Sequence, residues 1–193
     1  MLPMEHGSEH GRIERVRRRG VGERFPDLYT ELRSVADRVL GRHQSPSLAP
    51  SDLLHEAFFK LHAEEARSPA ETASRVLGEQ PDATFKACFG AACRDVLIDR
   101  LRRRGAQKRG GGQQHVEAHS RIFVPDDRER DALEIDDALN ALAHVDADAA
   151  RLVQARVFGG LTVAECAVLF GSSARTIDRR WAAAVEWLRA RLG

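Results

Sequence analysis

Residues 158–192 read FGGLTVAECAVLFGSSARTIDRRWAAAVEWLRARL, and this stretch decides the fold that we expect for the chain. Thr162 and Glu165 form the T-x-x-E pattern of a capping box, which predicts the start of a short helix. Ser172 or Ser173 stands before the next run of helical periodicity and can cap a second helix. The stretch therefore predicts two consecutive helices, over 162–170 and about 173–191.

The types and the spacing of Ala167, Gly171 and Ile177 are typical of a helix-turn-helix. A small residue lets the first helix cross the second closely, and a glycine adopts the positive φ of the turn. A β-branched residue then anchors the second helix in the core. The alternative is a plain helical hairpin whose charged face is only solvated. Because the capping box and all three residues agree, we favour the helix-turn-helix.

The second of these helices should have one buried face and one polar face. Its apolar side chains at helical spacing are Ile177, Trp181, Ala184, Val185 and Leu188. The predicted DNA contacts on the opposite face are Ser173, Arg175, Thr176, Asp178, Arg179 and Arg180. Side chains in the first turns of a recognition helix reach base edges and phosphates in the major groove, which is why we expect this face to bind DNA.

The rest of the chain also has helical periodicity, and Ala, Leu and Arg dominate its composition. We therefore expect an all-α protein of two small helical domains. A long helix over about 83–104 should end the first domain, because Gly105 and the glycines at 110–112 would stop it. The predicted parts are a disordered basic arm over 1–24, a first domain over 25–104, a flexible linker over 105–128 and a second domain over 129–193.

The charges are balanced in total but unevenly distributed. The 193 residues include 30 basic and 29 acidic ones, and 42% are hydrophobic, so the chain can bury a core and keep a polar surface. Segment 94–109 has a net charge of +5, segment 126–137 of −5, and segment 175–191 of +3. Both basic segments can attract a polyanion. We also expect the acidic segment to fold back onto one of the basic segments in the free protein.

Enzyme chemistry and a resident cofactor are not expected. His55 and Glu56 begin like a zinc-protease helix, but Phe59 stands where the second histidine would be needed, and no other metal-ligand spacing is present. The glycines at 110–112 are not followed by the Lys-Ser or Lys-Thr of a phosphate-binding loop. Three cysteines, no secretory signal and no apolar run near the roughly 18 residues of a membrane span favour a cytoplasmic protein without a membrane anchor.

Three motifs in this order resemble the extracytoplasmic-function (ECF) sigma factors of bacterial RNA polymerase. SDLLHEAFFKL at 51–61 is similar to region 2.2 of that family, TFKACFGAACRDVLIDRLRRRGAQKRGGG at 84–112 to regions 2.3 to 2.4, and the stretch at 158–192 to region four. The resemblance runs from about Phe25 to Leu192. It implies that the first domain binds the minus-ten element and the second the minus-35 element of a promoter. The linker would pass through the channel that nascent RNA uses.

The resemblance also implies roles for residues in the first domain. Residues on the solvent side of the long helix would hold the minus-ten element, namely Arg94, Asp95, Asp99, Arg100 and Arg103. The start of the preceding helix would dock on core polymerase through Asp52, His55 and Glu56. The implied partners are core RNA polymerase and promoter DNA, with an anti-sigma factor as an optional further partner. The alternative function is a stand-alone helix-turn-helix regulator, which would have no use for a polymerase-binding helix.

Overall fold

The computed structural model describes residues 20–41, 48–67, 80–110 and 127–193. Within these ranges the chain is entirely helical, with seven helices and no strand, which confirms the predicted all-α class. No helix there has the length and apolar character needed to cross a bilayer. The helices are α1 (Val21–Gly41), α2 (Pro50–Arg67), α4 (Asp82–Gly110), α5 (Asp127–Val145), α6 (Ala147–Val157), α7 (Val163–Leu169) and α8 (Ala174–Leu192).

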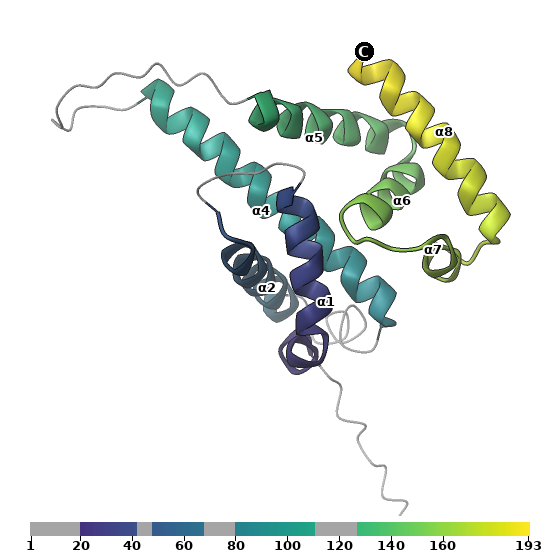
Figure 1. Ribbon diagram of the computed structural model, residues 1–193, viewed down its shortest axis with the longest axis horizontal. Helices are drawn as coiled ribbons and strands as arrows, with labels where there is room; N and C mark the ends of the chain where they lie inside the picture. Colours follow the sequence, from purple (N-terminus) through teal and green to yellow (C-terminus); the bar gives the residue numbers. More distant parts are fainter. Residues whose placement is uncertain (1–19, 42–47, 68–79, 111–126) are drawn as a thin grey trace, which may run out of the picture.

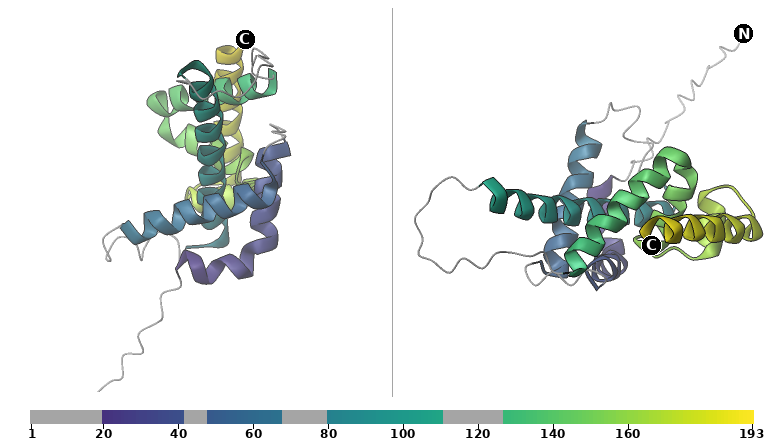
Figure 2. Two further views of the ribbon diagram at one scale, coloured as in Figure 1. Left: turned by 90° about the vertical axis from the view of Figure 1, so that its left-hand side faces the viewer. Right: turned by 90° about the horizontal axis from the view of Figure 1, so that it is seen from above.

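The long helix α4 lies in the middle of the molecule (Figure 1). Helices α1 and α2 pack on one side of it, and α5, α6 and α7 contact the other side, as the two further views in Figure 2 also show. Phe85 and Phe89 on α4 are fully buried in the same core cluster as Leu32 of α1 and Leu53 of α2. Burial of these side chains, each contributing about 1.5–3 kcal/mol, fixes the three N-terminal helices to one another.

The C-terminal helices form a second apolar cluster, against which Ala83 and Ala87 of α4 also pack. Leu152, Leu161, Cys166 and Ile177 are buried there, at 4% exposure or less. Trp181 is half-buried rather than fully buried, and it packs against both this cluster and the main core. The face that the sequence predicts to be apolar on α8 is therefore the face that packs against α5, α6 and α7.

Two predicted helix boundaries are wrong. Helix α1 begins at Val21, inside the predicted disordered arm, because Val21 is fully buried and its N–H donates to the Glu65 carboxylate on α2 at 3.1 Å. Helix α4 continues through Gly105 to Gly110. A glycine inside a helix costs only about 1 kcal/mol, which the Arg, Gln and Lys residues around it can offset because they favour helix.

The two halves of the chain are in direct contact through α4. A Cβ atom on Gly90 would lie 2.6 Å from the backbone nitrogen of Gly159, so only glycine permits this approach of α4 to the end of α6. Gly160 adopts a φ of 71° and lies against the guanidinium of Arg38 on α1. The proposed division into two domains stays a prediction, and the central part of the predicted linker, 111–126, lies outside the described residues.

Candidate nucleic-acid interface

Helices α7 and α8 are joined by a short turn, and both are capped by side chains. The Thr162 hydroxyl accepts a hydrogen bond from the Glu165 N–H at 3.2 Å, while the Thr162 N–H donates to the Glu165 carboxylate at 2.8 Å. Gly171, in the turn, has a φ of 57°, a backbone conformation that residues with a Cβ atom rarely adopt. The capping box therefore sets where α7 begins, and the glycine permits the turn between α7 and α8.

The first two turns of α8 carry an exposed basic face. Ser173 caps the helix by accepting a hydrogen bond from the Thr176 N–H at 3.2 Å, and the two hydroxyls lie 2.9 Å apart. Arg175, Arg179 and Arg180 are exposed. Asp178 is exposed as well, whereas Thr176 is half-buried. The six residues predicted to contact DNA are therefore brought together at one helix end.

The predicted minus-ten residues on α4 do not all face solvent. Arg94 is buried at 7% exposure, and its guanidinium forms an ion pair with Asp136 of α5 and donates to Asn140 Oδ1 at 3.1 Å. The prediction that Arg94 lies on the solvent side is wrong because α5 covers it. Asp99 and Arg103 are exposed, as expected.

Two further α4 residues are tied to α2 by ion pairs. Asp95 accepts a hydrogen bond from the Lys60 ammonium at 2.7 Å. Arg100 pairs with Glu56, so one contact joins a predicted DNA-binding residue to a predicted polymerase-binding residue. These pairs are half-exposed and therefore contribute little to stability, about 1 kcal/mol or less each.

The predicted polymerase-binding face of α2 also includes an aromatic residue that is not among the predicted contacts. Asp52 and His55 are exposed and Glu56 is half-exposed. Phe59 follows at the same helical spacing and is 64% exposed. Its position four residues after His55 and three after Glu56 is the signal that could have identified it.

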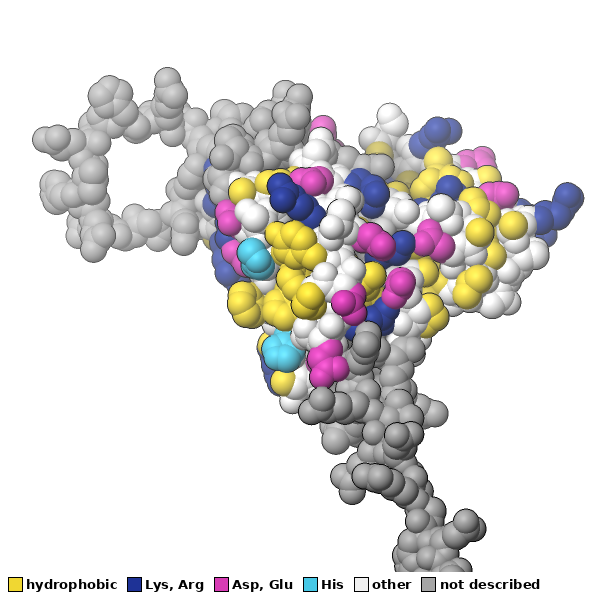
Figure 3. All heavy atoms as spheres, turned by 60° about the horizontal axis from the view of Figure 1, so that its bottom comes forward, with side chains coloured by type: hydrophobic (Ala, Val, Ile, Leu, Met, Phe, Trp, Pro, Cys, Tyr) yellow, Lys and Arg dark blue, Asp and Glu magenta, His cyan; other side chains and the backbone are white. Residues whose placement is uncertain are grey.

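Phe59 belongs to an aromatic cluster on α1 and α2. Its ring lies 5.6 Å from that of Phe58, which in turn lies 4.3 Å from Phe25 and is stacked on His62. Figure 3 shows hydrophobic side chains gathered beside histidines on the side of the molecule that α1 and α2 occupy in Figure 1. Exposed aromatic side chains on a rigid helix face are typical of protein-binding surfaces.

Lys86 of α4 and Glu165 of α7 link the two halves of the chain at the base of the α7–α8 pair. Lys86 donates to Glu165 at 2.8 Å and also lies 3.7 Å from Glu31 of α1. The hydrogen bonds from Lys86 and from the Thr162 backbone lower the pKa of Glu165 to about 2. Partial burial disfavours the charged Lys86, but its two carboxylate partners outweigh burial and raise its pKa. Both groups are thus charged over the physiological range.

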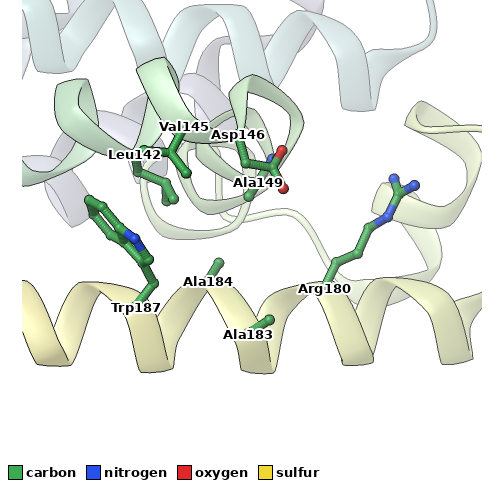
Figure 4. A pocket seen from close by; sticks show the side chains of 8 residues that line it. All are labelled: Leu142, Val145, Asp146, Ala149, Arg180, Ala183, Ala184 and Trp187. Carbon is green, nitrogen blue, oxygen red and sulfur yellow. The ribbon is translucent and has the colours of Figure 1, made fainter.

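A shallow groove between α5, α6 and α8 is too small for a typical ligand (Figure 4). Its volume is about 220 Å³, below the roughly 300–1,000 Å³ of most small-molecule sites. Its only carboxylate, Asp146, is occupied in capping α6, where it accepts from the Ala149 N–H at 2.9 Å. The lining residues are Leu142, Val145, Asp146, Ala149, Arg180, Ala183, Ala184 and Trp187.

The cysteines of the chain are structural in character. Cys93 and Cys166 are fully buried and Cys88 is half-buried, and none forms a disulfide. Burial raises the pKa of all three thiols, which keeps them protonated and unreactive. No group of three or more metal-binding side chains occurs in the parts of the chain that are described.

The chain matches one family along nearly its whole length. A model of the ECF sigma factor family matches residues 19–193, from the start of α1 to the end of α8. A search of curated proteins finds no match. The match covers all seven described helices and includes the stretches in which the sequence resembles regions 2.2 to 2.4 and region four. The chain belongs to the ECF sigma factor family, and its function is that of a sigma factor of RNA polymerase.

Proposed function

We propose that the chain directs core RNA polymerase to promoters through two separate DNA-binding faces, one on α8 and one on α4. The observation that carries this proposal is the exposed basic start of α8, supported by a capped α7 and a turn at Gly171. In this proposal α7 and α8 act as a helix-turn-helix that binds the minus-35 element. Arg175, Arg179 and Arg180 would reach bases and phosphates, as arginines commonly do in the major groove.

The face proposed for the minus-ten element lies on α4. Asp99, Arg100 and Arg103 are at least partly exposed, so DNA can reach them without a change in the fold. Arg94 and Asp95 are engaged by α5 and α2, and they would take part only after these contacts open. Two separate basic faces fit a protein that must contact two promoter elements at once.

The polymerase-binding surface is proposed to be the exposed face of α2. Asp52, His55 and Glu56 supply its polar part, and Phe59 supplies an aromatic anchor of the kind that dominates binding energy at protein interfaces. Because core polymerase works on the chromosome, the proposed location is the cytoplasm. An anti-sigma factor is proposed as a further partner on grounds of family membership alone.

Run-off transcription with purified core polymerase tests this proposal. The template is a library of genomic fragments, and the variants are Arg175→Ala with Arg179→Ala on α8 and the control Arg189→Ala. Arg189 lies on the same helix, is exposed and is far from the turn, so it controls for the loss of one arginine from α8. We expect specific transcripts with the parent and the control and few with the double variant.

The binding of core polymerase distinguishes a sigma factor from a stand-alone regulator. A parent chain that binds duplex DNA but neither binds core polymerase nor supports any specific transcript would contradict the proposed function.

A further inference from the structure

Two arginines of α6 each lie over an aromatic ring of the α7–α8 pair. The Arg156 guanidinium carbon is 4.3 Å from the centre of the Trp181 ring on α8. The Arg151 guanidinium carbon is 5.6 Å from the centre of the ring of Phe170, the residue that directly follows α7. Both distances are within the roughly 6 Å over which a cation is attracted to the face of an aromatic ring. Neither arginine is among the predicted DNA contacts, and the proposed function leaves both without a role.

The two arginines leave α6 on either side of its buried stripe. At about 100° per residue, Arg151 and Arg156 are about 140° apart around the helix. Leu152 and Ala155 fall between them, are buried and belong to one cluster with Ile177 of α8. Helix α6 contacts both α7 and α8 (Figure 1). The α7–α8 pair therefore packs on an apolar stripe of α6 that has one cation on each side.

Arg156 lies close to both helices of the pair. It is half-buried over Trp181 of α8, and its charge also acts on the thiol of Cys166 on α7. Burial raises the pKa of this thiol, and the positive charge of Arg156 opposes that effect in part. Because the guanidinium is planar and is attracted to the face of the ring, it favours one orientation of Trp181 more strictly than apolar packing alone. The contact therefore restrains rotation of α8 about its own axis.

Arg151 restrains the other end of the pair. Phe170 stands directly before Gly171, so the position of its ring affects the direction in which the chain enters the turn. Arg151 also forms an ion pair with Asp148 of α6 at 3.5 Å, and these two partners together limit where its side chain lies. Both ends of the turn that leads into α8 are thus fixed to α6.

We propose that Arg151 and Arg156 are positioning residues for the helix-turn-helix: each holds one aromatic ring of the α7–α8 pair, and together they fix the angle at which α8 meets the minus-35 element. The inference rests on the proposed function, because it takes α8 as the helix that reads this element. Arginine recognises a base through two hydrogen bonds of fixed direction, so a small rotation of α8 would misalign Arg175 and Arg179. Contacts with phosphates tolerate such a rotation better, because they carry no sequence information. Loss of the positioning arginines should therefore reduce sequence selection.

The variants remove either the cation or the ring of each contact. Arg156→Gln removes the cation but keeps a long polar side chain, whereas Arg156→Lys keeps a cation. Trp181→Leu removes the ring but keeps an apolar side chain. Arg151→Gln and Phe170→Leu are the corresponding changes at the other ring. The control is Arg189→Gln, which removes one exposed arginine about two turns beyond Trp181 on α8.

Run-off transcription with reconstituted polymerase measures the selection of the element. Each chain is compared on two templates, a promoter that the parent selects and the same promoter with its minus-35 element replaced, and the ratio of the two transcripts is the discrimination. We expect Arg156→Gln to lower this ratio about fivefold, the effect of losing one cation–π contact. Arg156→Lys should retain most of the ratio, and Arg189→Gln all of it. Arg156→Gln combined with Trp181→Leu should lower it no further than either change alone, because both remove the same contact.

Fluorescence of Trp181 reports the contact itself. The chain has two tryptophans, so Trp181 is the only one left in a Trp187→Phe background. We expect Arg156→Gln to increase the quenching of Trp181 by acrylamide, because the guanidinium no longer covers the ring, and Arg156→Lys to resemble the parent. Thermal melts by circular dichroism identify any variant that fails to fold. If Trp181→Leu is such a variant, Arg151→Gln and Phe170→Leu provide the same comparison at the other ring.

The outcomes separate this inference from a direct DNA contact and from the proposed function. If Arg156 bound a phosphate, Arg156→Gln would lower both transcripts by the same factor and Trp181→Leu would not reproduce its effect. That result, or unchanged discrimination in both Arg151→Gln and Arg156→Gln, would overturn the inference. Failure of the parent to give any specific transcript with core polymerase would instead refute the proposed function, while the quenching of Trp181 would still report the contact with Arg156.

Discussion

Truncation of Ile177 should destabilise the C-terminal helices strongly. Ile177 is fully buried on α8 and packs in one cluster with Leu152, Leu161 and Cys166. Ile177→Ala removes three buried carbon atoms, which costs about 2.4 kcal/mol at about 0.8 kcal/mol for each. The cavity that remains raises the expected loss in the free energy of unfolding to about 3–4 kcal/mol. Ile177→Val removes one carbon atom and should cost only about 1 kcal/mol.

Urea denaturation followed by tryptophan fluorescence measures this loss where it is expected. The chain has two tryptophans, and both Trp181 and Trp187 lie on α8, so their fluorescence reports on the C-terminal helices. Circular dichroism of the same samples reports on all helices, and a difference between the two transitions would show that the halves unfold separately. Val168→Ala is the control, because Val168 on α7 is 72% exposed. A loss below about 1 kcal/mol for Ile177→Ala, or equal losses for both Ile177 variants, would refute the assignment of Ile177 as the anchor of α8.

Three further predictions concern the pH dependence of the fold and the two binding faces. The pKa of Glu165 is lowered to about 2 from its ordinary 4.5, chiefly by Lys86, so this contact stabilises the fold above pH 4.5 and is lost as the pH falls to about 2. An acid titration of Glu165→Gln by tryptophan fluorescence should therefore lack this part of the transition, and a curve identical to the parent's would count against it. Arg175→Ala or Arg179→Ala should each weaken binding to a selected promoter fragment by about 1–3 kcal/mol in anisotropy assays, whereas unchanged affinity of both would exclude α8 as the reading helix. Phe59→Ala should weaken binding to core polymerase by about 2 kcal/mol in a pull-down titration without lowering the melting temperature, since its side chain is 64% exposed, and unaltered binding would remove it from the interface.

Local signals made the C-terminal helix pair predictable. Thr162, Glu165 and Ser173 cap helices through hydrogen bonds to residues three positions away, so the pattern in the sequence is itself the contact. Gly171 is needed for its own backbone conformation, and Ile177 follows from helical periodicity. Helix class, the caps and the exposed basic face of α8 all depend on such short-range information.

Long-range contacts account for what the sequence did not reveal. Arg94 has the charge of a surface residue, and its burial depends on Asp136, which lies 42 residues away and pairs with it only in the folded chain. The sequence places Val21 at the end of a polar, arginine-rich stretch, which predicts disorder, whereas its burial depends on α2 and its hydrogen-bond partner Glu65 lies 44 residues away. The continuation of α4 past Gly105 shows that one glycine among strong helix formers does not by itself end a helix.

A promoter-selection experiment with reconstituted polymerase tests most directly whether α8 and α4 contact two different promoter elements. Core enzyme with the parent chain, with Arg179→Ala on α8 or with Arg103→Ala on α4 transcribes a template library that is randomised upstream of the start site, and the transcripts are sequenced. We expect the parent to select two separated elements. Arg179→Ala should relax selection at the upstream element only, and Arg103→Ala at the downstream element only. Loss of selection at the same element in both variants, or no selection by the parent, would contradict this expectation.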